Sequence, residues 1–296
     1  MSTSSPSAAG SAARLGQIGI WSGELRFGDE GQRREAAAEL DELGYGSLWI
    51  PGGIGGELFK DMDLLLKAAP RAGVASGILN IWRHEPADAG AWWKGLSGAH
   101  QARTMLGVGV SHGPLIGADY TKPLTKMTQF LDGLDAAGFP VEARCIAALG
   151  PKMLDLSRDR SAGSHPYLVP VAHTAWARER MGAGALLAPE LGVVLETDPA
   201  KARDIARQAL KPYQGLPNYV NNWKRFGFTD AEATEASDGL IDAIFAWGTP
   251  EKIAEMVKAH LAAGADHVCL QVIRGAMGAH RDMPLGEWRR LAPALL

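Results

Sequence analysis

The sequence predicts an α/β fold in which parallel strands alternate with helices and close into a (β/α)8 TIM barrel. Short apolar runs rich in β-type residues recur, and each is followed by a segment with helical spacing. No linker interrupts this alternation, which implies a parallel sheet covered by helices. About eight strand–helix units within about 280 residues fit a closed barrel better than an open doubly wound sheet.

The expected strands are short apolar segments bounded by glycine, proline or polar residues. They cover residues 15–21, 46–50, 74–81, 103–110, 144–149, 164–169, 186–195 and 266–273. The third strand contains Gly77, and a glycine inside a strand often marks a bulge or a close backbone approach.

The expected helices have apolar residues three or four positions apart and recognisable ends. Asp29 can cap the first, which Gly44 ends, and Pro151 suits the first turn of another. The later helices cover residues 61–72, 86–100, 122–137, 172–181, 199–210, 249–263 and 284–295. Residues 213–247 read as a helical insertion, with one or two short helices, before the last helix–strand unit.

The composition of the chain limits the kinds of molecule that it is expected to bind. The chain has 296 residues, 46% of them hydrophobic, and a formal net charge of −3, so nothing indicates a nucleic-acid or membrane-surface partner. Cys145 and Cys269 lie far apart and form no metal-type pair. The composition suits a reducing, cytoplasmic compartment. No apolar run reaches the roughly 20 residues of a membrane span.

The first 14 residues are small and polar without an apolar segment, and are expected to form a disordered leader. Residues 15–296 are then a single barrel domain.

Two glycine-rich runs fail the dinucleotide-binding fingerprint. Counted from Gly53, the third glycine position falls on Leu58, and in the 107–109 run it falls on His112. No phosphate-loop lysine follows either run. We interpret the two glycine-rich runs as turns and sites of close strand packing, although their backbone NH groups could face a ligand.

Several polar residues follow predicted strands, where a barrel has its active-site face. His112 ends the fourth strand and Glu24 follows the first in a glycine-containing loop, so both are candidate acid–base catalysts. A capping imidazole and a solvated carboxylate are the alternatives. After His84–Glu85, Asp88 occupies the second histidine position of a zinc motif, so we expect no metal site.

Other polar and aromatic residues could have either a structural role or a ligand-binding role. Asn80 ends an apolar run, so its amide either holds its own loop or contacts a ligand. Three strand-end tryptophans suit either a core or a planar cofactor; they are Trp21, Trp49 and Trp82. His165 and His267 are placed at strand starts and read as structural.

Two segments offer polar sites at helix starts, and the first of them favours an anion. Leu149, Gly150 and Pro151 end the fifth strand and open a helix, whose first NH groups are free. His173 and Thr174 follow the sixth strand and offer a second polar site.

Five segments together resemble the bacterial luciferase-like (LLM class) family of flavin and deazaflavin oxidoreductases. They are GILNIWRHEP at Gly77, MLGVGVSHG at Met105, ALGPKML at Ala148, YLVPVAHT at Tyr167 and HLAAGADHVCLQVI at His260. Their order and spacing cover nearly the whole chain after the leader. The resemblance is closest to the actinobacterial branch that uses coenzyme F420.

The resemblance implies a (β/α)8 barrel, often a homodimer, with the cofactor ring at the carboxyl ends of the strands. Many members have a non-proline cis peptide in a bulge of the third strand, and the matching bond here is Gly77–Ile78. Implied ring or ribityl contacts are Asn80, Val110, Ser111 and His112. Implied phosphate-tail contacts are Leu149, Gly150 and Pro151, with His173 and Thr174 as further candidates.

One departure from the family bears on the reaction. Members that oxidise sugar phosphates or secondary alcohols carry an Asp-His pair after the second strand, where this chain has Pro51–Gly52. The resemblance therefore implies no alcohol oxidation but leaves open the reduction of an activated double bond or carbonyl. His112, Glu24 or water would then supply the proton.

The sequence thus leads to an F420-dependent oxidoreductase acting on a small-molecule substrate. The first alternative is an FMN-dependent monooxygenase of the same barrel, which needs O₂ and a flavin reductase partner. The second is a barrel that binds a flavin or another ligand without turnover.

Overall fold

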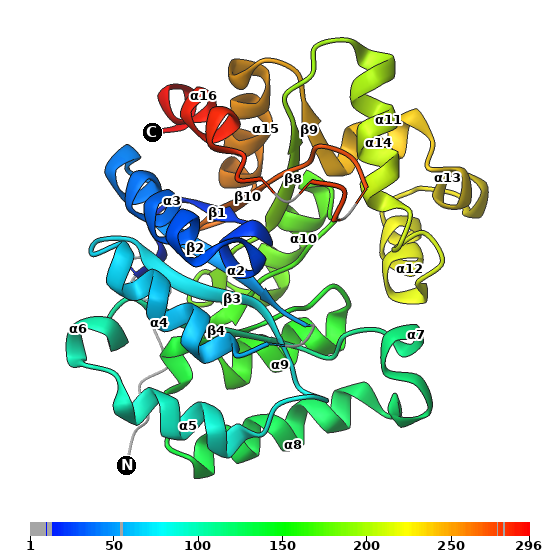
Figure 1. Ribbon diagram of the computed structural model, residues 1–296. Coiled ribbons are helices and arrows are strands. Elements are labelled where there is room, and N and C mark those ends of the chain that lie inside the picture. Colours follow the sequence, from blue (N-terminus) through cyan, green and yellow to red (C-terminus); the bar gives the residue numbers. More distant parts are fainter. Residues whose placement is uncertain (1–9, 11–13, 54–55, 277, 281) are drawn as a thin grey trace.

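A computed structural model describes residues 10, 14–53, 56–276, 278–280 and 282–296, so most of the predicted leader lies outside the described residues. Its strands form one parallel sheet in the order β7-β6-β5-β4-β3-β2-β1-β10-β8-β9. The sheet curls into a barrel with helices around it (Figure 1). The strands are β1 (Ile18–Trp21), β2 (Ser47–Gly52), β3 (Gly73–Asn80), β4 (Thr104–Gly109), β5 (Arg144–Ile146), β6 (Gly163–Ser164), β7 (Leu186–Leu187), β8 (Glu190–Val194), β9 (Phe245–Trp247) and β10 (Val268–Val272).

The barrel closes through the stretch that contains β7 and β8. The single strand predicted over 186–195 is interrupted at Ala188 and Pro189. On one side, the Ala188 NH donates to Ser164 O at 2.9 Å; on the other, Pro189 O accepts from the Cys269 NH at 2.9 Å. Counted as one strand, this stretch completes the ring, so the predicted (β/α)8 barrel is confirmed. β9 is an added strand that pairs with β8.

The helices largely follow the predicted ranges. They are α2 (Glu24–Phe27), α3 (Glu30–Leu43), α4 (Leu58–Ala68), α5 (Pro86–Gly95), α6 (Gly98–Gln101), α7 (Gly113–Ile116), α8 (Pro123–Ala136), α9 (Pro151–Arg160), α10 (Val171–Met181), α11 (Pro199–Leu210), α12 (Pro217–Arg225), α13 (Asp230–Glu235), α14 (Asp238–Ile244), α15 (Pro250–Ala262) and α16 (Leu285–Leu295). Asp29 caps α3 by accepting from the Gln32 NH at 3.1 Å. The helix predicted over 86–100 is instead split into α5 and α6, because Leu96 is extended and Ser97 caps a new helix.

The segment after α11 is more structured than the sequence predicted. It contains three helices, α12 to α14, and then β9, instead of one or two short helices. Thr229 forms a capping box with Glu232, and Ser237 caps α14, so each begins a new helix. Trp223 anchors α12 to the barrel, since its indole NH donates to Leu168 O at 2.9 Å.

A bulge in β3 lies near the carboxyl end of the barrel. The Gly77–Ile78 peptide bond is cis, as the resemblance implies. Pairing with β2 and with β4 shifts register across this point. Both neighbours carry glycine here: a Cβ at Gly52 would lie 2.7 Å from Ile78 O, and one at Gly107 would lie 2.1 Å from Ser76 O. The two glycine runs therefore serve close strand packing at these positions.

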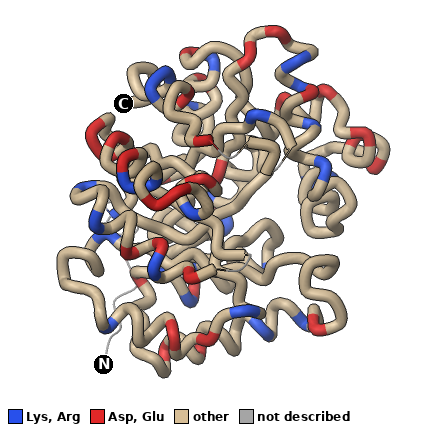
Figure 2. The backbone as a smooth tube through the Cα atoms, in the orientation of Figure 1, with Lys and Arg blue, Asp and Glu red and all other residues tan. Residues whose placement is uncertain are grey.

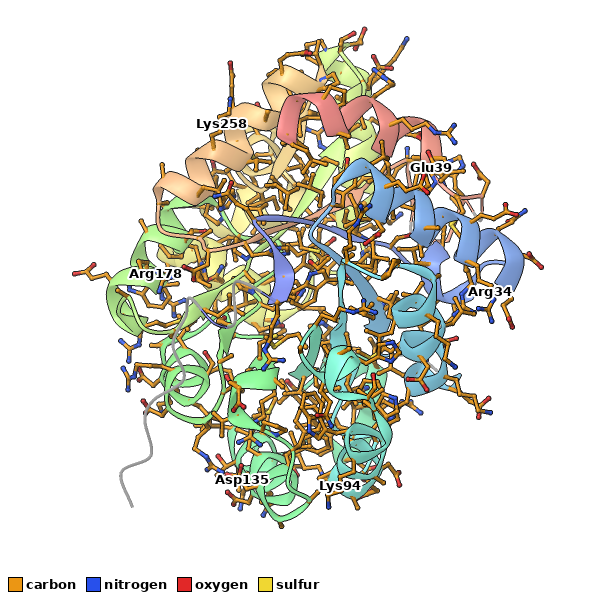
Figure 3. The ribbon with its side chains drawn as sticks, turned by 90° about the vertical axis from the view of Figure 1, so that its left-hand side faces the viewer. Arg34, Glu39, Lys94, Asp135, Arg178 and Lys258 are labelled. Carbon is orange, nitrogen blue, oxygen red and sulfur yellow. The ribbon has the colours of Figure 1, made fainter. Side chains whose placement is uncertain are left out.

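Charged residues are distributed over the outer helices and loops. In the view of Figure 2, basic and acidic positions are interspersed over these elements. Side chains such as Arg34, Lys94 and Lys258 extend outward from the helical layer (Figure 3). Within the described ranges, no helix combines the length and apolar character needed to cross a membrane.

Candidate functional site

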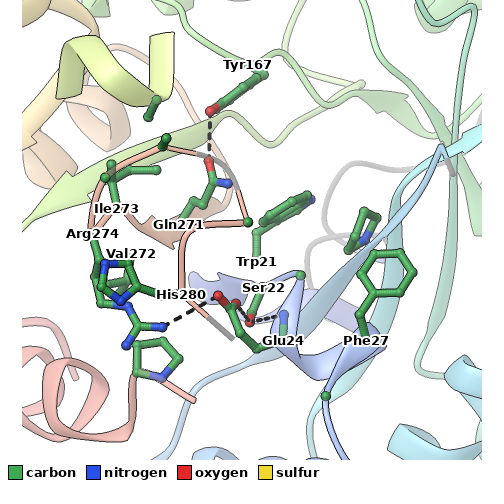
Figure 4. A pocket seen from close by; sticks show the side chains of 18 residues that line it. Trp21, Ser22, Glu24, Phe27, Tyr167, Gln271, Val272, Ile273, Arg274 and His280 are labelled. Atoms are coloured by element: carbon green, nitrogen blue, oxygen red, sulfur yellow. Dashed lines mark hydrogen bonds and ion pairs between the residues drawn. The ribbon is translucent and has the colours of Figure 1, made fainter. Parts of the chain in front are cut away.

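A cavity of about 480 Å³ opens at the carboxyl ends of β1, β2 and β10. Trp21 ends β1 and Gln271 lies near the end of β10, and both line the cavity (Figure 4). Pro51, near the end of β2, also lines it. Parts of the segment between β10 and α16 form the opposite wall. This is the face where (β/α)8 barrels build their active sites.

Glu24 lies in the wall of this cavity. It is the first residue of α2 and not a loop residue, so the predicted local structure was wrong. Ser22 explains the helix start, because its hydroxyl oxygen accepts from the NH groups of Glu24 (3.1 Å) and Leu25 (3.3 Å). The same hydroxyl donates to Glu24 Oε2 at 2.6 Å, and Glu24 Oε1 lies 3.7 Å from Arg274 Nη2.

Trp21 connects the cavity to the β3 bulge. Its indole NH donates to Gly77 O at 2.7 Å. Across the cavity the Tyr167 hydroxyl donates to Gln271 Oε1 at 2.8 Å (Figure 4). Of the other strand-end tryptophans, Trp49 is fully buried, while Trp82 joins two loops by donating to Val110 O at 2.7 Å.

The residues implied in ring binding lie together at the ends of β3 and β4. The Ile78 side chain packs where Gly109 has no Cβ. Asn80 is buried and accepts from the Trp82 NH at 3.0 Å, so its carbonyl oxygen holds its own loop. Ser111 has a left-handed backbone, with φ +54°, and turns the chain after β4. Cofactor contact by any of these residues stays a prediction.

His112 lies half-buried beyond this turn. Its ring contacts Tyr219, with centroids 5.5 Å apart, and Tyr213, with centroids 6.2 Å apart. Its Nδ1 is buried and has no hydrogen-bond partner among the described residues. Burial lowers the pKa of His112, so the imidazole is neutral near pH 7.

The structure does not bring the two predicted catalysts together. Glu24 lines the cavity, whereas His112 does not. Tyr213 packs on His112 and also on Tyr167, a cavity residue, with centroids 5.6 Å apart in the second pair. His112 is thus connected to the cavity wall through ring contacts with Tyr213 and Tyr167.

The predicted phosphate-tail segment opens α9. Gly150 is the N-cap, with φ −93° and ψ 163°, and a Cβ there would meet no atom within 4 Å. His173 holds the preceding loop, because its Nε2 lies 3.1 Å from Leu149 O and must donate to it. The Thr174 hydroxyl bonds His260 Nδ1 at 2.8 Å, and both residues are buried. The structure thus gives both side chains protein partners, and their cofactor contact stays a prediction.

Sequence reasoning missed a buried acid–imidazole pair inside the barrel. Glu190 was not considered, and His165 was placed at a strand start, although it directly follows β6. His165 Nε2 lies 3.5 Å from Glu190 Oε2, and its ring stacks on Trp49 with centroids 4.1 Å apart. The sequence did offer one signal for this pair, because Glu190 is a carboxylate within the apolar run of residues 186–195.

These two side chains face each other, and His165 Nε2 has no hydrogen-bond partner among the described residues. His165 Nδ1 is 2.7 Å from Ala188 O, a pure acceptor, so Nδ1 carries a hydrogen. Nε2 then faces Glu190 Oε2. Burial raises the pKa of Glu190, and His165 opposes that shift. The pair adjoins the bulge, since a Cβ at Gly77 would lie 3.1 Å from His165 Nε2.

Sequence comparison gives no assignment, since neither a family model nor a curated protein matches the chain. Within the described part of the chain, no group of three or more His, Cys, Asp and Glu residues is arranged to hold a metal ion.

Solved structures share the fold. An F420-dependent secondary alcohol dehydrogenase, in complex with an F420–acetone adduct, is 14% identical with a TM-score of 0.67, over 87% of this chain and 93% of that one. The F420-dependent tetrahydromethanopterin reductase of Methanopyrus kandleri is 14% identical with a TM-score of 0.68, over 95% and 98%. A type II Baeyer–Villiger monooxygenase from Pseudomonas putida, in complex with FMN, is 15% identical with a TM-score of 0.60, over 95% and 98%.

Proposed function

We propose that this protein is an F420-dependent oxidoreductase that transfers a hydride between the deazaflavin and a small organic substrate. One observation carries the proposal: the β3 bulge adjoins a largely apolar cavity at the carboxyl ends of the strands, with Trp21 in contact with both. Two of the similar structures are described as F420-dependent, and one of them is in complex with an F420–acetone adduct.

The residues present fit a flat ring with an anionic tail. The bulge and the Val110–His112 turn would hold the ring, where His112 Nδ1 is buried without a partner. Gly150 faces open space at the start of α9, and the exposed Lys152 in the first turn adds positive charge. Free NH groups at a helix start favour an anion. When bound, the deazaflavin supplies the hydride chemistry.

The chain's own residues would orient the substrate and exclude water. Trp21 and Tyr167 supply flat walls, and the Tyr167–Gln271 hydrogen bond fixes the amide of Gln271. Glu24 would accept a hydrogen bond from the substrate at Oε1, because its Oε2 already accepts one from the Ser22 hydroxyl. His112 is neutral near pH 7, because burial lowers its pKa, and so acts as a hydrogen-bond donor or a base.

The position of Pro51 favours reduction over alcohol oxidation. Pro51 lines the cavity at the place where the alcohol-oxidising members carry an acid–base pair. Proline and the following Gly52 have no titratable side-chain atom. Reduction of an activated double bond or carbonyl needs no base at this position.

The FMN-dependent alternative also has a supporting observation, since an FMN complex shares the fold. That reaction would require O₂ and a flavin reductase partner. A barrel that binds a flavin without turnover is the remaining alternative, and the missing acid–base pair motivates it.

Two substitutions at Gly150 test the proposed position of the anionic tail. Aspartate and asparagine are both good N-caps, and the Cβ of either would meet no atom within 4 Å. Gly150→Asp places a negative charge at the start of α9, whereas Gly150→Asn is its neutral match. We expect Gly150→Asp to bind F420 roughly tenfold more weakly than Gly150→Asn, with similar melting temperatures. Titration by cofactor fluorescence measures this difference, and equal affinities would exclude this helix start as the tail site.

A further inference from the structure

Two tyrosines of the helical insertion pack against His112. Tyr219 lies in α12, and Tyr213 lies in the connection between α11 and α12. The ring centroid of His112 is 5.5 Å from that of Tyr219 and 6.2 Å from that of Tyr213. The two tyrosine rings also contact each other, at an interplanar angle of 80° and with centroids 5.2 Å apart. The imidazole that follows β4 is therefore packed against two rings from a segment far along the chain.

Contacts with the barrel hold this pair of tyrosines in place. Tyr219 is buried and packs on Trp223, whose indole NH donates to Leu168 O at 2.9 Å. Tyr213 packs on Tyr167, the residue before Leu168, with centroids 5.6 Å apart. Both tyrosines are thus tied to the segment that follows β6, so their position against His112 does not depend on the chain connection alone.

This packing disfavours a proton on His112. Its Nδ1 is buried and has no hydrogen-bond partner among the described residues. An imidazolium carries hydrogen on both ring nitrogens, so protonation would leave a charged N–H group buried without an acceptor, which is costly.

The neighbouring rings bring no charge that would offset this cost. Among the described residues, the titratable side chains in ring contact with His112 are Tyr213 and Tyr219. Burial raises the pKa of both tyrosines, and the nearby Glu190 adds to each shift, so both stay uncharged near pH 7. Burial likewise lowers the pKa of His112. The two tyrosines therefore remove water from the imidazole without supplying a counter-charge.

We propose that Tyr213 and Tyr219 are positioning residues that keep the His112 imidazole uncharged, so that the helical insertion completes the site at the end of β4. An uncharged imidazole donates at one nitrogen and accepts at the other, whereas an imidazolium only donates. That a cofactor or substrate uses this imidazole rests on the proposed function. The charge state of His112 rests on the packing of the three rings alone.

An NMR titration of the full-length protein without cofactor tests this assignment. Labelling the histidine Cε1 atoms with ¹³C follows each imidazole, and His112→Gln identifies the resonance of His112. We expect Tyr219→Ala to raise the pKa of His112 by at least about half a unit, toward the value near 6.5 of a solvated histidine. Tyr219→Phe keeps the ring and loses the hydroxyl, so it should retain the parent's pKa.

A second aromatic residue of the insertion provides the control. Phe226 directly follows α12 and packs on His173, with centroids 5.6 Å apart. Phe226→Ala should therefore leave the pKa of His112 unchanged. An unchanged pKa in a folded Tyr219→Ala protein would overturn the proposal, and so would an equal rise in Phe226→Ala or in Tyr219→Phe.

Tyr213 gives an independent variant if Tyr219→Ala does not fold. Its side chain is only partly buried, so Tyr213→Ala removes less packing. It should raise the pKa of His112 in the same direction, and an unchanged pKa would again overturn the proposal. F420 titration of the same proteins separates the two proposals. The expected pKa shifts without F420 binding would contradict only the proposed function, whereas F420 binding without the shifts would contradict only this inference.

Discussion

The partners of His267 fix its protonation state. Its Nδ1 lies 2.8 Å from Gly16 O, so Nδ1 carries the hydrogen. Its Nε2 accepts from the Trp49 indole NH at 3.2 Å. Protonation of Nε2 would set two N–H groups against each other in a buried site. Burial accordingly lowers the pKa of His267 to about 4.

His267 is one of three buried histidines that should make the protein sensitive to acid. Burial also lowers the pKa values of His173 and His260 to about 4. An unfolded histidine has a pKa near 6.5, so the unfolded state takes up protons first as pH falls. The free energy of unfolding should therefore fall between about pH 6.5 and about pH 4, by up to about 1.4 kcal/mol per histidine for each pKa unit.

Denaturant unfolding at about pH 7 and about pH 5 measures this dependence. His267→Gln should lose less stability between the two pH values than the parent protein, although it is less stable at both. His280→Gln removes an exposed imidazole and should retain the parent's full pH dependence. If His267→Gln were as acid-sensitive as the parent, His267 would not be a source of the effect.

Single residues also show what the sequence could predict. Gly77 was singled out because glycine weakens a strand, and a bulge lies there. The capping role of Asp29 followed from local spacing. Glu190 and His165 could not be paired in advance, because they meet only when the segment after β6 reaches the start of β8, where Tyr167 forms a bridge with Glu190.

At the level of elements, the β3 bulge depends on glycine in the strand beside it. A Cβ at Gly107 would lie 2.1 Å from Ser76 O, a backbone atom that cannot move alone. We expect Gly107→Ala to lower the free energy of unfolding by about 1–3 kcal/mol, the usual range for overpacking. Denaturant unfolding with an unchanged m-value is the measurement.

A matched substitution separates the contact from the general effect of replacing glycine. A Cβ at Gly95, the last residue of α5, meets no atom within 4 Å. Gly95→Ala should leave stability unchanged or raise it by up to about 1 kcal/mol, because alanine favours a helix. Equal effects at Gly95 and Gly107 would show that the close approach to Ser76 O carries no cost.

Some elements were visible in the sequence and others were not. Helices such as α3, α8 and α11 have apolar spacing and clear ends, so their ranges were predicted closely. β9 has three residues and follows α14 directly, so it could not be told from a helical insertion. One continuous strand was expected where the structure has β7 and β8. Pro189 lies between them, and because proline has no NH it cannot donate to the sheet there.

At the scale of the whole molecule, the closed barrel brings distant segments to one cavity. Trp21 and Gln271 stand near opposite ends of the chain, and parallel pairing of β1 with β10 sets them side by side. Alternating strands and helices predicted this closure. The cavity itself was beyond prediction, because its far wall comes from the irregular segment before α16, whose path depends on contacts such as Arg274 with Asp282.

The most direct test of the proposed function is a titration of the purified apo-protein with F420 and, separately, with FMN, followed by cofactor fluorescence. Our account predicts selective binding of F420, with a dissociation constant in the micromolar range or below, about −8 kcal/mol or tighter. Selective binding of FMN would contradict it and favour the oxygen-dependent monooxygenase. Binding of neither cofactor would contradict the assignment of a flavin-type oxidoreductase altogether.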